Sequence, residues 1–214
     1  MLERHKFHSL NLITKARKHI ANRDRVLLGI IRARGFQRIP ILKATYFGGL
    51  TRSIVYQQLA PKAASCVWNR VRYAVSRNGH PTPKNIVDRR PDELRALGLS
   101  TSKAKFIWGL AVEWINGRFK SQAWHRMTNA EIRDLLMGVN GVGPWTADMF
   151  LIFSLGRTDV MPLQDYGLQR AIKLAYGIKH LPRERDLIEF ARKWHPFESF
   201  ACWQLWKYLD SQIT

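Results

Sequence analysis

The sequence predicts an all-α protein, and three observations support this prediction. Apolar residues recur at helical spacing along most of the chain, and no segment shows the strict alternation that a half-buried strand requires. Serine, threonine or proline precedes several of these segments, and glycine follows several, as at helix ends. The stretch GVNGVGP joins two such segments as a tight turn. At 214 residues the chain can form one domain or two closely joined lobes.

The charge balance indicates a polyanionic partner. Lys and Arg number 35 against 16 Asp and Glu, a formal net charge of +19, and the pI is about 10.6. An excess of this size is hard to distribute without a basic patch, and nucleic acid is the most common polyanion that such patches bind. The alternative is a basic surface that only keeps the protein in solution.

The two cysteines, Cys66 and Cys202, lie far apart and have no neighbours at metal-ligand spacing. We expect buried thiols rather than disulfides or an iron–sulfur cluster, and no metal site. The N-terminal residues lack the apolar core of a signal peptide, and no apolar run reaches about 18 residues. We therefore expect no membrane association and a cytoplasmic, nucleoid-associated protein.

Amphipathic patterns and helix-breaking residues predict the first helices. Residues 1–34 predict two basic amphipathic helices that break near residues 22–24. After a loop, a helix containing Leu50 and Ile54 ends near Gln57 or Gln58, because Pro61 disfavours helical geometry at the residue before it. The two glutamines could project from the helix pair, or they could only satisfy the loop backbone.

Pro61 opens the next helix, since proline suits the first helical position. Residues 91–97 predict a short helix that Gly98 ends, and Ser100 caps a longer helix that ends near residues 116–117. Thr128 and Glu131 form a capping box, so a further helix runs from there to about Met137. The buried stripes of the helices from Pro61 and Ser100 are Ala64, Val67, Trp68, Val71 and Val75, and Phe106, Ile107, Leu110, Ala111, Trp114 and Ile115.

The turn at residues 138–143 carries glycines that allow positive φ and close backbone approach. Val142 between Gly141 and Gly143 can pack into the core. Pro144 then starts a helix over 144–155 that is apolar almost all round and so must be buried. Exposed amides and the dipole at the start of this helix favour an anion such as a phosphate diester.

Asp165 follows a proline turn and precedes an amphipathic stretch over 166–172, which places it at or near a helix N-terminus. Two roles are open at this point. An N-cap aspartate stabilises a helix by roughly 1 kcal/mol, and a carboxylate held at a helix start can also be catalytic.

Residues 136–172 resemble the helix–hairpin–helix, Gly/Pro-rich loop and aspartate of the HhH-GPD DNA glycosylase superfamily. The resemblance is greatest to the compact form of its alkylpurine branch, the 3-methyladenine DNA glycosylase II family. Residues 52–59 are similar to the family's Gln-Gln helix end, although Tyr56 stands where a small residue is usual, and residues 194–206 are similar to its aromatic last helix.

The resemblance implies a two-lobed helical fold with an active-site cleft between the lobes. One lobe would comprise residues 1–45 and 163–214, and the other residues 46–162 with the hairpin at 136–146. It implies a monomer that binds double-stranded DNA containing damaged bases, and no cofactor beyond a possible monovalent cation at the hairpin. The implied site residues are Asp165 for catalysis, Trp145, Trp206 and Met149 for the base pocket, Gln58 and Leu59 for the DNA wedge, and Gly138, Gly141, Val142, Gly143 and Thr146 for the phosphate-binding hairpin.

The expected chemistry is hydrolysis of the N-glycosidic bond without strand cleavage. Bifunctional relatives place a lysine nucleophile where this chain has Trp145, so no amine is available there for a Schiff base. A purine alkylated at N3 or N7 already carries positive charge and leaves without protonation, so the single carboxylate of Asp165 suffices. The alternatives are excision of deaminated or oxidised bases on the same scaffold, and a non-catalytic helix–hairpin–helix module that only binds DNA.

Overall fold

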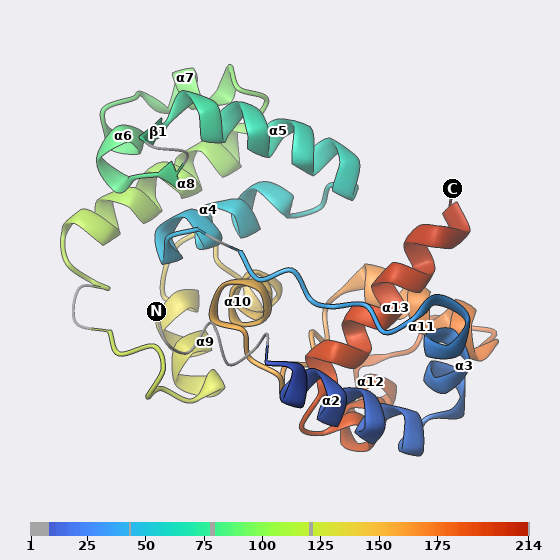
Figure 1. The fold of residues 1–214 in the computed structure, drawn as a ribbon. Coiled ribbons are helices and arrows are strands. Elements are labelled where there is room, and N and C mark those ends of the chain that lie inside the picture. The colour runs from blue at the N-terminus through green and yellow to red at the C-terminus, as the bar shows by residue number, and fades with distance from the viewer. Residues whose placement is uncertain (1–8, 43, 78–79, 120–121, 214) are drawn as a thin grey trace. The chain divides into compact units, whose positions relative to one another are not determined.

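A computed structural model describes residues 9–42, 44–77, 80–119 and 122–213, which are built almost entirely from helices (Figure 1). The all-α prediction is confirmed. The elements in chain order are α2 (Leu10–Arg23), α3 (Arg25–Arg34), α4 (Tyr46–Tyr56), α5 (Pro61–Ala74), β1 (Ser76–Arg77), β2 (His80–Pro81), α6 (Pro83–Val87), α7 (Pro91–Arg95), α8 (Thr101–Ile115), α9 (Asn129–Met137), α10 (Pro144–Phe150), the π-helix η1 (Leu151–Leu155), α11 (Tyr166–Tyr176), α12 (Glu184–Trp194) and α13 (Glu198–Ile213).

The chain forms two compact units. The hairpin unit is residues 42–150, and the aspartate unit combines residues 1–41 with residues 151–214. The division falls before residue 151, upstream of the expected one after residue 162. Residues 158–161 bond to α13, which explains why this loop belongs with the C-terminal helices.

In the hairpin unit, α8 packs against α4, α6 and α7, and α4 also packs against α5 and α10. Aromatic rings connect these helices: Phe47 meets Trp114 edge-on at 5.4 Å, Trp114 lies 4.6 Å from Phe119, and Trp124 meets Phe150 at 5.3 Å. Such pairs contribute beyond the area they bury. This core supports α4 and α10. The first is followed by residues 57–60, here called the glutamine loop, and the N-terminus of the second adjoins the hairpin.

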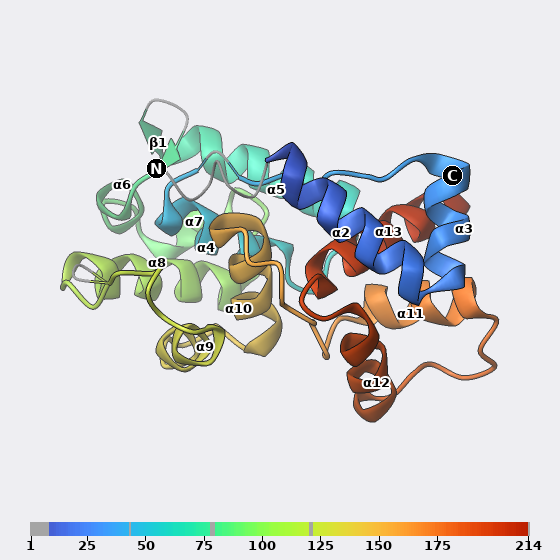
Figure 2. The same ribbon diagram turned by 60° about the horizontal axis from the view of Figure 1, so that its bottom comes forward.

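In the aspartate unit, α11 lies along α13 in both Figure 1 and Figure 2, and α3 and α12 also pack on α13. Trp194 and Phe200 are among the largest fully buried side chains. The long last helix is therefore the element on which this unit is assembled.

The predicted helix ends agree closely with the structure. Asp24 separates α2 from α3 and caps α3, Pro61 opens α5, and Ser100 caps α8. The capping box of Thr128 and Glu131 is present at the start of α9. Local side-chain-to-backbone hydrogen bonds set the boundaries at Asp24, Ser100 and Thr128, and the fixed φ of proline suits Pro61 to the start of α5. Such local causes can be identified from sequence.

Four expectations need correction. The thiol of Cys66 was expected to be buried but lies on an exposed residue, whereas Cys202 is buried as expected. A two-residue antiparallel ladder pairs Ser76 with Pro81, a contact too short to leave an alternating pattern. The helix from Pro144 does not stay α-helical to residue 155 but widens into η1 over its last five residues. Ile115 was expected in the core stripe of α8, but its side chain is 54% exposed at the end of the helix.

No helix in the part of the chain that the structure describes is long and apolar enough to cross a membrane.

Asp24 ties together three segments of the aspartate unit. Its Oδ1 accepts hydrogen bonds from the amides of Val26 and Leu27 at the start of α3. Its Oδ2 accepts from the Tyr176 hydroxyl at 2.6 Å and from Trp194 Nε1 at 3.0 Å. Burial, followed by the bond to Asp24, raises the pKa of Tyr176 far above its usual value, so this phenol remains a donor.

We predict that Asp24→Ala lowers the free energy of unfolding by roughly 3–5 kcal/mol, because it removes a cap and leaves two largely buried donors unsatisfied. Asp24→Asn should lower the free energy of unfolding by less, because Asn is an equally good cap. Some loss should remain, because the Asn side chain places an amide group near the two donors. Denaturant unfolding of both variants measures the difference. An Asp24→Ala protein as stable as the wild type would contradict this account.

Candidate active site

The hairpin between α9 and α10 needs glycine at one position for a steric reason. Gly141 has φ +85°, and a Cβ built there would lie 2.1 Å from Cγ of Phe106. Val142 is 5% exposed, so it packs into the core as predicted, and Val139 is also buried. At Gly143 a Cβ would meet nothing within 4 Å, so the outer side of the turn is open.

Gln57 connects the end of α4 to this hairpin. Its Nε2 donates to the carbonyl of Gly141 at 2.9 Å and to Oγ1 of Thr146 at 2.8 Å. Thr146 is 1% exposed, so the part given to its side chain by this structure is to hold Gln57. Neither bond has a sequence signal, because the partners lie 84 and 89 residues apart.

The two wedge candidates stand out from this anchor. The backbone of Gln58 has φ +52°, in the left-handed region that residues other than glycine rarely adopt. Both Gln58 and Leu59 are exposed, Leu59 by 39%. A large exposed apolar side chain beside a strained residue suits insertion into another molecule, because strain of this kind tends to concentrate at functional sites.

An ion pair holds the two helices of the hairpin together. Arg133 Nε of α9 lies 2.7 Å from Oδ1 of Asp148 in α10. Asp148 is 5% exposed, so the guanidinium stabilises a carboxylate that would otherwise be costly to bury. Asp148 thus stabilises the packing of the two hairpin helices.

In the aspartate unit, Asp165 caps α11. Its Oδ1 accepts a short hydrogen bond from the amide of Leu168 and a second, at 2.9 Å, from Nε1 of Trp206. The residue is 8% exposed. A Cβ at Gly167 would lie 3.2 Å from the same oxygen and 3.8 Å from the Trp206 ring, so glycine leaves room for this contact. The capping role predicted for Asp165 is confirmed, and Trp206 is its bonded partner.

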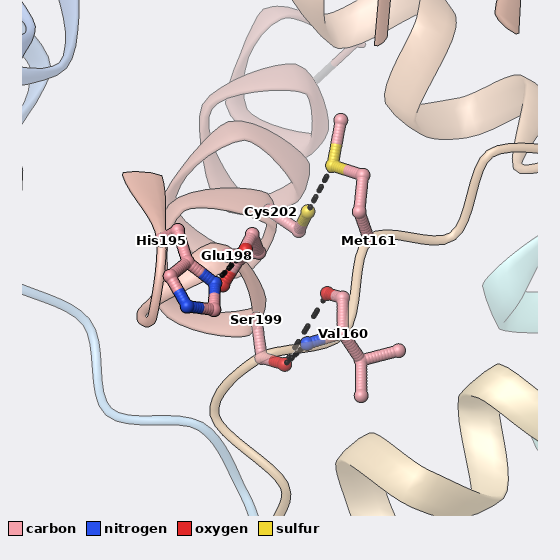
Figure 3. A network of polar contacts seen from close by, with 6 residues as sticks. All are labelled: Val160, Met161, His195, Glu198, Ser199 and Cys202. Carbon is pink, nitrogen blue, oxygen red and sulfur yellow. Dashed lines mark hydrogen bonds and ion pairs between the residues drawn. The ribbon is translucent and has the colours of Figure 1, made fainter. Parts of the chain in front are cut away.

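The loop ahead of Asp165 is fastened to α13, as Figure 3 shows. Oγ of Ser199 bonds to the amide and the carbonyl of Val160, and the thiol of Cys202 lies 3.6 Å from the sulfur of Met161. Ser199, Cys202 and Trp206 are spaced by three and four residues, which places them along one face of the helix. One helix face therefore holds both the loop and the tryptophan that bonds to the carboxylate.

Aromatic side chains extend this site. The ring of Trp206 stacks on Phe153 of η1 at 6.1 Å with an interplanar angle of 30°. Trp203 meets Phe153 edge-on at 5.8 Å. Trp203 and Trp206 are thus neighbouring rings of one aromatic cluster, to which the π-helix contributes Phe153.

The remaining predicted residues belong to α10 in the hairpin unit. Met149 is buried, 7% exposed, whereas Trp145 is half-buried. The carbonyls of Val139 and Gly141 already accept hydrogen bonds, from Val142 and Gln57. A carbonyl keeps a second lone pair, so a monovalent cation at this turn stays a prediction. No cluster of three His, Cys, Asp or Glu suited to a metal occurs among the described residues.

The structure defines a class of protein: an all-helical chain with a helix–hairpin–helix, followed by a loop and a capping aspartate backed by tryptophan. Residues 51–196 match the HhH-GPD superfamily of base excision DNA repair proteins, and the chain belongs to this superfamily. The resemblance inferred from the sequence is confirmed.

Named relatives cover nearly the whole chain. DNA-3-methyladenine glycosylase 1 of Schizosaccharomyces pombe is 32% identical over 200 residues, 91% of this chain and 87% of the relative. The solved structure of the Schizosaccharomyces pombe 3-methyladenine DNA glycosylase in complex with abasic DNA has a TM-score of 0.82 at 30% identity, covering 90% of this chain and 95% of that one. The DNA-3-methyladenine glycosidase of Bacillus halodurans has a TM-score of 0.74 at 32% identity, covering 92% and 90%.

The two hairpin glycines form a matched pair for a test. Gly141→Ala should destabilise the protein by roughly 2–4 kcal/mol, because the methyl group would overlap Phe106 and the positive φ disfavours alanine. Gly143→Ala should leave the free energy of unfolding within about 1 kcal/mol of wild type, since its Cβ points into open space. Equal losses in thermal or denaturant unfolding would contradict the geometry of the turn.

Proposed function

We propose that this protein is a monofunctional DNA glycosylase of base excision repair that hydrolyses the N-glycosidic bond of alkylated purines in double-stranded DNA. The named relatives are 3-methyladenine DNA glycosylases, and one of them was solved on abasic DNA. The net charge of +19 suits a phosphate backbone. The observation that carries the chemical part is the Asp165 carboxylate, held by the Leu168 amide and Trp206 Nε1.

In the proposed reaction Asp165 stabilises positive charge on the deoxyribose as the base departs, and water then attacks the sugar carbon. The two donors on Oδ1 hold the carboxylate in a fixed orientation. A base alkylated at N3 or N7 takes the bonding electrons as it leaves, which neutralises its own charge, so no general acid is required. Trp206, which bonds to Asp165, offers an electron-rich ring for the cationic base. Trp145 of the hairpin unit stays a predicted base-pocket residue.

The hairpin and the glutamine loop supply the DNA contacts in this proposal. The turn from Gly138 to Gly143 approaches a phosphate through backbone amides on its open side. Gln58 and Leu59 enter the duplex and fill the space left when the target nucleotide leaves the stack. The enzyme acts as a monomer in this proposal, because both sets of residues come from one chain.

Asp165→Asn tests the catalytic assignment. We expect it to lower the single-turnover rate of 7-methylguanine release by roughly a hundredfold or more, because the developing positive charge loses its counter-charge. Asn is an equally good N-cap, so folding and DNA affinity should persist.

Asp159→Asn provides the matched control, because Asp159 is exposed in the turn ahead of the loop. It should release base at the wild-type rate. A wild-type rate in Asp165→Asn would refute the site, and a wild-type protein that binds damaged DNA without releasing base would indicate a non-catalytic module.

The second test concerns strand cleavage. A lyase needs an amine that forms a Schiff base with the sugar, and Trp145 stands where bifunctional relatives carry lysine. We expect borohydride to trap no covalent complex during turnover, and the product to be abasic DNA with an intact backbone. A borohydride-trapped protein–DNA complex on a denaturing gel would show that another amine performs this chemistry.

A further inference from the structure

Lys103 of α8 holds the last turn of α4 and the start of the glutamine loop. Its Nζ donates to the carbonyl of Val55 at 2.9 Å and to the carbonyl of Gln57 at 2.6 Å. Carbonyls at a helix C-terminus have no partner within the helix, so a cation there satisfies them and complements the helix dipole. The side chain is half-buried, and burial lowers the pKa of Lys103 below its usual value.

The location of this lysine is unfavourable for its own helix. Lys103 lies in the first turn of α8, where its amide bonds to the capping Ser100 at 3.2 Å. A positive charge at this end opposes the helix dipole, and a carboxylate would be the stabilising choice. The interaction that accounts for the charge is therefore the one with α4, not one within α8.

Gln57 is consequently held at two points. Lys103 fixes its backbone carbonyl, and the hairpin fixes its side chain through Gly141 and Thr146. The next residue, Gln58, must remain at φ +52°, and the turn closes by a 3.4 Å bond from the Leu59 amide to the Tyr56 carbonyl. Left-handed backbone of this kind persists only where the surrounding contacts impose it.

We propose that Lys103 is a positioning residue for base extrusion, which keeps Gln58 and Leu59 in the conformation that enters the duplex before DNA is bound. This inference rests on the proposed function, because it assigns to Lys103 a part in the same glycosylase reaction. Lys103 touches neither the base nor the sugar in this scheme. Preordering the loop lowers the cost of inserting it, so the lysine contributes most when the target base must be pulled from a stable pair.

The test compares Lys103→Met with Lys105→Met, an exposed lysine on the same helix that controls for the loss of one charge. Single-turnover release of 7-methylguanine is measured on two duplexes, one with cytosine and one with an abasic-site analogue opposite the lesion. We expect Lys103→Met to be about tenfold slower than Lys105→Met opposite cytosine, and less than about threefold slower opposite the abasic analogue. Lys103→Arg, which keeps a charged donor, should fall between the wild type and Lys103→Met on the paired substrate.

Two results would overturn the proposal. Equal rates for Lys103→Met and Lys105→Met opposite cytosine would show that the lysine does not contribute, and an equal loss on both duplexes would show a merely structural role. Should Lys103→Met fail to fold, Lys103→Arg is judged by the same two duplexes. Absence of base release by the wild type would overturn the proposed function itself. Base release by the wild type without a selective effect of Lys103→Met would overturn only the role of Lys103.

Discussion

The hydrogen bond from Trp206 Nε1 to Oδ1 of Asp165 is the contact on which the proposed chemistry depends. It joins the start of α11 to the last helix, and it fixes a nearly buried carboxylate that also caps α11. Around it, Gly167 leaves the space, and Ser199 and Cys202 hold the preceding loop on the same face of α13. Capping and the proposed catalysis are compatible here because both use a side-chain oxygen that is held in a fixed orientation.

In the hairpin unit, too, polar side-chain contacts hold separate segments together. Gln57 joins the glutamine loop to the turn, Lys103 holds its carbonyl, and the ion pair of Arg133 with Asp148 joins the two hairpin helices. Each of these side chains satisfies polar groups that would otherwise be costly to bury. Next to these contacts, the side chains of Gln58 and Leu59 are exposed and the space beside Gly143 is open.

The parts that the sequence predicted are those with local causes. The caps at Ser100, Thr128 and Asp165 depend on neighbours a few residues away, and the positive φ of Gly141 is a property of the backbone at that residue. The contacts of Gln57 and Lys103 join residues 46 to 89 positions apart, and no periodicity reports such pairs. The π-helical turn was also missed, because its apolar residues fit an α-helix equally well.

The central claim is that one carboxylate suffices because the departing base already carries positive charge. The most direct measurement is single-turnover release by the wild-type protein from matched duplexes containing 3-methyladenine, 7-methylguanine or hypoxanthine. The account predicts rapid release of the two cationic bases and little release of neutral hypoxanthine. Preferential release of hypoxanthine would contradict it, because a neutral purine needs a proton donor that this mechanism does not provide.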